Sequence, residues 1–124
     1  MGNLLVIDDE AQARRMLRIF LERLGHEVLD AEDGDAGLAI VRDNQVDLII
    51  TDIVMPNKEG LETITEIRRL QENVKIIAIS GGGRFGNTDY LEIAERFGAD
   101  KTFHKPLDLD NLEAAINELL AGDG

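Results

Sequence analysis

The sequence contains no cysteine and no tryptophan among its 124 residues, and aromatic residues make up only 4% of it. Without cysteine the protein forms neither disulfide bonds nor thiolate metal sites, and its two isolated histidines make no metal cluster. No apolar run approaches the roughly 20 residues that cross a bilayer, and the first residues lack a signal-peptide pattern. We therefore expect a cytoplasmic protein without membrane contact.

Positive charge is also scarce in this chain. Lysine and arginine number 13 against 25 aspartate and glutamate residues, which gives a net charge of −12. Nucleic-acid backbones repel such a surface, so we expect no direct binding to DNA or RNA. The length and an apolar content of 44% suit one domain with a core of its own, which we expect to span residues 1–124.

Short apolar runs alternate along the chain with helical patterns. The runs predict strands at 4–7, 26–32, 46–52, 75–80 and 101–104. The helical patterns fall at 11–24, around 38–41, at 61–70, at 90–97 and from an N-cap at Asp108 through Leu120. Regular alternation with continuous apolar strands predicts an α/β fold, a doubly wound parallel sheet of five strands with helices on both faces.

Two of these helices have apolar faces that the spacing defines. One face of the first helix is formed by Met16, Leu17, Phe20, Leu21 and Leu24, with Gly25 as a stop signal. The face of the third helix is formed by Leu61, Ile64, Ile67 and Leu70. We expect both faces to lie against the sheet.

Acidic residues lie at the carboxyl ends of two predicted strands. In an open α/β sheet, ligands bind at this edge. Asp8 and Asp9 follow the first strand and Asp52 ends the third, while Ser80 ends the fourth and Lys105 follows the fifth. Two carboxylates about 4 Å apart repel by roughly 4 kcal/mol, so such a cluster favours a bound cation, and hard carboxylate oxygens suit Mg²⁺. A carboxylate beside a metal ion and a lysine is also a competent nucleophile toward phosphorus.

These residues, in this order and spacing, resemble the receiver domain of two-component response regulators (CheY-like). The matching features are Asp8-Asp9, the segment TDIVMPNKEG around Asp52, Ser80, and Lys105-Pro106. The resemblance covers essentially the whole chain, including the Gly-Ala-Asp that precedes the fifth strand. It implies a flavodoxin-like sheet with strand order 2-1-3-4-5.

The resemblance also implies a role for each residue of this edge. Asp52 is the implied phosphoacceptor, and Ser80, the backbone of Gly81 and Lys105 contact the phosphoryl group. The implied Mg²⁺ site is formed by Asp9, Asp52 and the backbone carbonyl of Val54, with Asp8 helping through water. Such a protein is not an enzyme in the usual sense, but a phosphoacceptor that assists its own aspartyl phosphorylation and dephosphorylation. Its implied partners are a sensor histidine kinase or a histidine phosphotransfer protein, and a downstream protein target.

The sequence departs from the family pattern at one position. Receivers commonly carry tyrosine or phenylalanine three residues before the lysine, where this chain has Thr102. Phe103 is adjacent, but side chains alternate along a strand, so we expect it to point into the core. We interpret His26 and His104 as ordinary surface or strand-edge residues. Arg14, Arg15 and Arg18 form a basic patch on the first helix, which is usually a solvated face but could also meet an acidic partner.

The segment SGGGRFGNT, Ser80 to Thr88, lies between a strand and a helix and nearly fits a nucleotide-binding P-loop. The lysine that such a loop needs for the outer phosphates is replaced by Asn87. We interpret the segment instead as a lid of the phosphorylation site, ordered by a phosphoryl group through the freedom of its glycines.

Other functions remain open at this level. The same fold and site would serve a phosphorelay shuttle between two histidine proteins. An aspartate-nucleophile phosphatase would require an acid two residues after the nucleophile, where this chain has Val54. A P-loop enzyme lacks its lysine, and a flavin mononucleotide carrier lacks the phosphate loop after its first strand.

Overall fold

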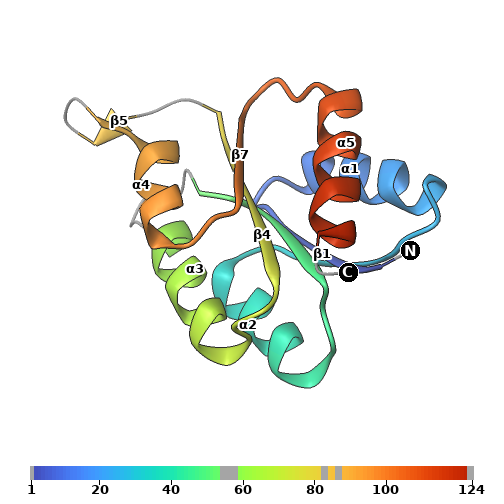
Figure 1. Ribbon diagram of the computed structural model, residues 1–124, viewed down its shortest axis with the longest axis horizontal. Helices are drawn as coiled ribbons and strands as arrows, with labels where there is room; N and C mark the ends of the chain where they lie inside the picture. Colours follow the sequence, from blue (N-terminus) through green and yellow to red (C-terminus); the bar gives the residue numbers. More distant parts are fainter. Residues whose placement is uncertain (1, 54–58, 82–83, 86–87, 123–124) are drawn as a thin grey trace.

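The computed structural model describes residues 2–53, 59–81, 84–85 and 88–122. A parallel sheet of five strands in the order β2-β1-β3-β4-β7 runs through the middle of the molecule (Figure 1). Its strands are β1 (Asn3–Ile7), β2 (Glu27–Ala31), β3 (Leu48–Asp52), β4 (Lys75–Ser80) and β7 (Lys101–His104). The predicted fold class and strand order are therefore confirmed.

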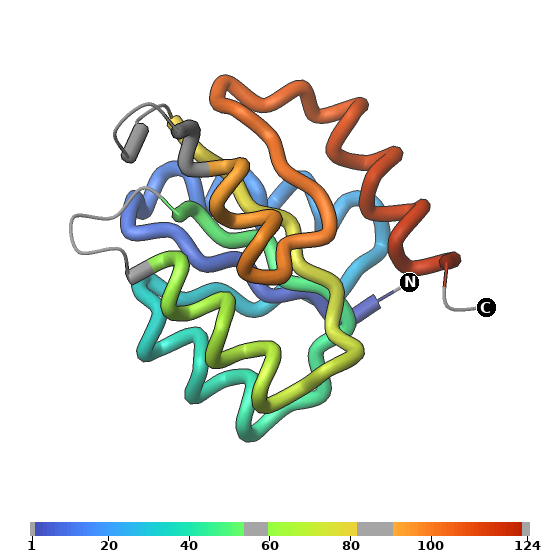
Figure 2. Tube along the Cα trace, turned by 60° about the vertical axis from the view of Figure 1, so that its left-hand side comes forward, coloured from blue at the N-terminus to red at the C-terminus, as the bar shows by residue number. Residues whose placement is uncertain are grey.

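Helices cover both faces of this sheet. They are α1 (Ala11–Arg23), α2 (Gly34–Asp43), α3 (Glu59–Leu70), α4 (Tyr90–Phe97) and α5 (Leu109–Ala121). The first and the last helix lie on one face, and α2, α3 and α4 lie on the other, with α2 and α3 side by side (Figures 1 and 2). Within the described residues no helix combines the length and the apolar character that crossing a membrane requires.

The core forms two layers, one on each face of the sheet. Leu5, Ile49 and Ile76 belong to the layer under α2, α3 and α4, whereas Leu4 and Leu48 belong to the layer under α1 and α5. Neighbouring residues of one strand are thus buried on opposite faces, as the alternation of side chains along a strand requires. This is why the strands read as continuous apolar runs.

The segment after β4 contains two short strands that the sequence does not predict. Arg84–Phe85 (β5) and Thr88–Asp89 (β6) pair as a small antiparallel ladder, which lies outside the main sheet. The lid predicted for Ser80 to Thr88 rests on the run Gly81 to Gly83, of which Gly82 and Gly83 lie outside the described residues.

Two helix ends follow the sequence signals closely. The carboxylate of Asp108 accepts the N–H groups of Asp110 and Asn111, so the predicted cap of α5 is confirmed. Gly25 has φ 97°, and the N–H groups of Gly25 and His26 donate to the carbonyls of Glu22 and Leu21. This pattern is a Schellman motif, whose left-handed residue favours glycine, and it ends α1 and turns the chain into β2.

The predicted apolar faces are wrong at their margins. Met16 on α1 is 46% exposed and Leu70 on α3 is 44% exposed. The central residues of the same faces, Leu17 and Ile64 among them, are buried. Spacing defines the apolar direction of a helix, but the width of the neighbouring layer decides which of its residues are covered.

His26 directly precedes β2, the edge strand of the sheet, so it takes the strand-edge position and not the surface position that the sequence allows. The residue is only 7% exposed, and its Nδ1 accepts the N–H of Gly2 at 3.1 Å. The backbone N–H of Glu27 also donates to the carbonyl of Gly2. The imidazole therefore helps to hold the start of β1 against the start of β2.

This contact predicts a pH dependence of stability. Burial lowers the pKa of His26 below its ordinary value of 6.5, so the stability that it contributes is fully present above that pH and is lost as the pH falls through the lower folded value. We expect the free energy of unfolding to fall between about pH 7.5 and 5.5, and to fall less in His26→Asn, which keeps an acceptor but does not titrate. Denaturant unfolding at both pH values measures the difference. The exposed His104, changed to Asn, is the control, and equal losses in wild type and His26→Asn would contradict the assignment.

Arg68 joins three elements at the amino-terminal end of the sheet. Its guanidinium donates to the carbonyl of Gly98 and pairs with the carboxylate of Asp100 at 2.7 Å. The same carboxylate accepts the N–H of Ile76 at 2.8 Å. Gly98 has φ +122°, a conformation that favours glycine. Because Arg68 bonds to both Gly98 and Asp100, it fixes the turn that leads from α4 into β7.

Candidate functional site

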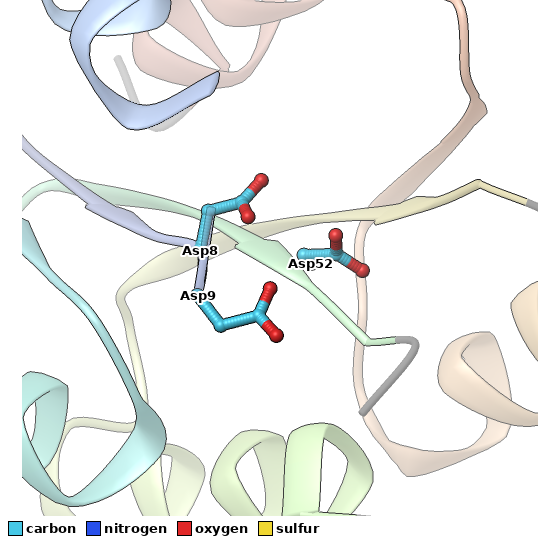
Figure 3. A group of neighbouring side chains, drawn as sticks. All are labelled: Asp8, Asp9 and Asp52. Atoms are coloured by element: carbon cyan, nitrogen blue, oxygen red, sulfur yellow. The ribbon is translucent and has the colours of Figure 1, made fainter. Parts of the chain in front are cut away.

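The carboxyl ends of β1 and β3 bring three aspartates together. Ile7 and Thr51 are register partners, so Asp8 follows one strand beside the point where Asp52 ends the other. Carboxylate oxygens of Asp8, Asp9 and Asp52 all lie within 4.8 Å of one another, and the side chains reach into the same space (Figure 3). Asp8 is 2% exposed and Asp52 7%, whereas Asp9 is exposed to solvent.

Lys105 supplies positive charge to this cluster. Its ammonium donates to Oδ2 of Asp52 at 2.9 Å and to Oδ2 of Asp8 at 3.3 Å. Burial by itself lowers the pKa of Lys105, but the hydrogen bonds and charges of Asp52 and Asp8 outweigh it and raise the pKa above its ordinary value. Lys105 is therefore a firmly protonated group that lies against the two buried carboxylates.

Asp8 is held from several sides. Its N–H donates to the carbonyl of Ala31 in β2, and its Oδ1 accepts the N–H of Glu10 at 2.8 Å. Burial raises the pKa of Asp8 above its ordinary value, although the Glu10 amide and the ammonium of Lys105 favour the carboxylate. The carboxyl group is thus one that a further cation would stabilise in its charged form.

The basic face predicted on α1 is only partly a solvated one. Nη1 of Arg14 donates to the backbone carbonyl of Asp8 at 2.8 Å, and Arg14 is half-buried. Arg18 pairs instead with Glu22 and Asp30 on the surface, at 3.4 and 3.7 Å. No spacing in the sequence distinguishes Arg14 from its neighbours, because its bond depends on the path of the turn before α1.

Ser80 and Gly81 lie at the end of β4, on the Lys105 side of the cluster. Ser80 is fully buried, and its carbonyl accepts the N–H of Lys105 at 2.8 Å. Gly81 is exposed, and a Cβ at this position would lie 3.7 Å from Cδ of Lys105, an ordinary contact. Gly81 is therefore next to the lysine side chain. Val54, the remaining residue of the predicted metal set, lies outside the described residues.

Gly60 secures the position of the chain after Asp52. It is buried in the first turn of α3, and a Cβ there would lie 2.6 Å from Cα of Ile53. Since real Cβ atoms do not approach backbone so closely, only glycine lets α3 begin against the residue that follows Asp52.

Thr102, which stands where receivers commonly have an aromatic residue, and its neighbour Phe103 lie as expected. Phe103 packs against the core layer under α1 and α5, while Thr102 precedes it on the alternate face of β7 and is half-buried. The prediction that Phe103 points into the core is confirmed.

The chemistry of this cluster fits a hard divalent cation. Three carboxylates within reach of one another present oxygen ligands, and the exposed Asp9 leaves one side open to solvent. Mg²⁺ binds through one or two carboxylates and keeps several waters, which such an open oxygen cluster permits. Among the residues that the structure describes, Lys105 compensates only part of the charge of the three carboxylates, so the cluster keeps a net negative charge that a cation can neutralise.

Comparison with known proteins decides the family. The sequence profile of the response regulator receiver domain matches residues 4–117. The chain belongs to the response regulator receiver family. Receiver domains are phosphoacceptors of two-component signalling that bind Mg²⁺ at an acidic site and interact with histidine kinases or phosphotransfer proteins. The similarities support phosphorylation-dependent signalling and do not favour the alternatives, which are a phosphorelay shuttle, an aspartate-nucleophile phosphatase and a P-loop enzyme.

Individual relatives support the same family. This receiver is 34% identical to Protein PilH of Pseudomonas aeruginosa, covering 98% of this chain and 100% of that protein. It is 32% identical to the transcriptional regulatory protein CpxR of Klebsiella pneumoniae over 97% of this chain, but it spans only 50% of that protein's length. A crystal structure of the response regulator TrrA from Thermotoga maritima, in complex with Mg²⁺-BeF, superimposes with a TM-score of 0.82 at 32% identity, covering 97% of this receiver and 100% of that chain.

Proposed function

We propose that residues 1–124 act as one receiver module in which Asp52 accepts a phosphoryl group and thereby changes how the protein binds its partner. The observation that carries this proposal is the contact of Asp52 with Lys105 at 2.9 Å inside a cluster of three aspartates. Asp52 is buried enough to have a fixed orientation, yet it stands at the edge of the sheet where ligands of such folds bind.

The transfer forms one bond and breaks another. A carboxylate oxygen of Asp52 attacks phosphorus, the bond from phosphorus to the donor nitrogen of a phosphohistidine breaks, and the imidazole leaves with that electron pair. Lys105 stays protonated and places its ammonium beside the phosphoryl oxygens as negative charge gathers there. Positioning and charge neutralisation supply most of the catalysis in such transfers.

Asp8, Asp9, Asp52 and the backbone carbonyl of Val54 are the proposed Mg²⁺ ligands. When bound, the ion supplies charge neutralisation and a fixed orientation for phosphoryl oxygens. Asp8 is already held by Glu10 and Lys105, whereas the exposed Asp9 is free to adjust its carboxylate. We therefore assign Asp9 as a direct ligand and Asp8 as a partner that acts through water.

Ser80 and Gly81 are the proposed phosphoryl contacts at the end of β4. The hydroxyl of Ser80 and the N–H of Gly81 would donate to phosphoryl oxygens beside Lys105. The exposure of Gly81 keeps this side accessible to the water that hydrolyses the aspartyl phosphate. In this way the receiver assists both its own phosphorylation and its own dephosphorylation.

The phosphodonor protein is proposed to approach over an apolar groove next to the site. A cavity of about 400 Å³ runs between α1 and the segment after β7, and its walls include Asp8, Met16, Lys105 and Leu107. The 46% exposure of Met16 presents apolar surface at its rim. A sensor histidine kinase or a histidine phosphotransfer protein would place its phosphohistidine at Asp52 from here, in the cytoplasm. A change at the same site would alter binding to a downstream protein.

The proposal is tested with a small phosphodonor, because no partner is needed. We expect acetyl phosphate with Mg²⁺ to add the mass of one phosphoryl group to the protein, and the label to disappear when Mg²⁺ is chelated. Intact-protein mass spectrometry measures both. A protein that stays unlabelled with Mg²⁺ over a range of phosphodonor concentrations, or that is labelled equally without it, would refute this function.

A further inference from the structure

We propose that Arg14 is a positioning residue, which holds the Asp8–Asp9 turn in the orientation that Mg²⁺ binding requires. The effect on Mg²⁺ rests on the proposed function, whereas the hold of Arg14 on the turn does not depend on it. The observation behind it is the bond of 2.8 Å from Nη1 of Arg14 to the backbone carbonyl of Asp8. No part of the phosphoryl transfer uses Arg14 directly.

The bond fixes more than a single atom. The carbonyl of Asp8 belongs to the peptide unit that joins Asp8 to Asp9, and a peptide unit is planar. Holding its oxygen therefore sets the direction in which the chain enters Asp9. The N–H of Asp8 is held by Ala31, and its carboxylate is held by Glu10 and Lys105. Loss of the bond from Arg14 would therefore let this peptide unit rotate.

The first turn of α1 lacks a side-chain cap, and Arg14 helps to hold the chain that leads into it. Unlike α2 and α5, which Asp33 and Asp108 cap, α1 has no side-chain cap from Glu10 and no acidic residue in its first turn. The turn is closed in other ways: Oδ1 of Asp8 accepts the N–H of Glu10, and Arg14 reaches back over one helical turn to the carbonyl of Asp8. A charged donor of this kind makes a stronger bond than a neutral one.

Position and charge act in opposite directions on Mg²⁺ affinity. The positive charge of Arg14 repels a cation in the cluster, so loss of the charge alone would tighten Mg²⁺ binding. Loss of the orientation of Asp9 would weaken it, because partners that orient metal ligands commonly contribute about tenfold in affinity. The sign of the change therefore separates the two roles.

The experiment compares Arg14→Met with Arg15→Met by isothermal titration with Mg²⁺. Arg15 is exposed on the same helix, and its change removes the same charge. We expect affinity to fall about tenfold in Arg14→Met, to stay equal or rise in Arg15→Met, and to recover in part in Arg14→Lys. At saturating Mg²⁺ the labelling rate of Arg14→Met should return close to the wild-type rate, because Arg14 does not touch the phosphoryl group. Unchanged or tighter Mg²⁺ binding in Arg14→Met, or a rate that stays low at saturation, would overturn the inference.

A second readout needs no metal. In Arg14→Met we expect faster hydrogen exchange at the N–H of Glu10, which donates to Asp8, with exchange unchanged in the last turn of α1. If wild type itself bound no Mg²⁺, the proposed function would fail, and this exchange would still decide whether Arg14 holds the turn. Equal exchange at Glu10 in wild type and Arg14→Met would refute the positioning role.

Discussion

Asp52→Asn is expected to abolish phosphorylation by acetyl phosphate with Mg²⁺. Asparagine keeps the shape of the side chain and an oxygen that accepts the bond from Lys105, which is 2.9 Å long in the wild type. Its amide is not a carboxylate nucleophile, so no aspartyl phosphate forms. Intact-protein mass spectrometry of wild type and variant, at equal phosphodonor concentration and time, measures the loss.

The control for this variant is Asp108→Asn, the same chemical change at the cap of α5. Asparagine caps helices about as well as aspartate, so this protein should be labelled like wild type. Asp52→Asn should not be less stable than wild type, since it removes one of three mutually repelling carboxylates. Undiminished labelling of Asp52→Asn would move the phosphoacceptor to another residue.

Asp9→Ala is expected to weaken Mg²⁺ binding by more than about tenfold, and toward 100-fold, because even partners that only orient a metal ligand contribute this much. Asp9 is exposed, so its truncation removes little packing. Without Mg²⁺ the variant should be as stable as wild type or more stable, because repulsion within the cluster decreases. With Mg²⁺ the order should reverse, since only a protein that binds the ion gains stability from it.

Thermal unfolding with and without Mg²⁺, beside isothermal titration, measures both parts of this prediction. Glu10→Gln is the matched control, because it removes an exposed negative charge next to Asp9 whose side chain does not cap α1. It should lower Mg²⁺ affinity far less than Asp9→Ala does. Equal effects of the two variants would mean that Asp9 acts through its charge alone and is not a ligand.

Much of this protein was predictable because the signals are local. Strand β4 and helix α4 have the bounds that the sequence predicts, and Asp108 caps α5 as expected. Apolar period and capping chemistry act over a few neighbouring residues, so they can be read from the chain itself. The strand order came from resemblance to a family, because spacing alone does not say which strands are neighbours.

The failures share a cause, which is that they depend on neighbours distant in sequence. Met16 lies at the margin of a helix face, and its exposure depends on where the adjoining layer ends. His26 is buried, and the group that it accepts from, the N–H of Gly2, lies 24 residues away. In the glycine-rich segment after Ser80, Arg84–Phe85 pairs with Thr88–Asp89 as a short antiparallel ladder. Strands of two residues are too short to show an apolar pattern in the sequence.

The sequence by itself determined which groups this site contains: the carboxylates of Asp8, Asp9 and Asp52 and the ammonium of Lys105, each next to a strand end. Only the tertiary structure decided which of these groups bond to one another. Lys105 donates to two aspartates, one 97 and one 53 residues away, and Arg14 of α1 holds the carbonyl of Asp8. The physical reason is that a residue type fixes a charge, whereas a bond of about 3 Å depends on the register of a whole sheet and the path of its turns.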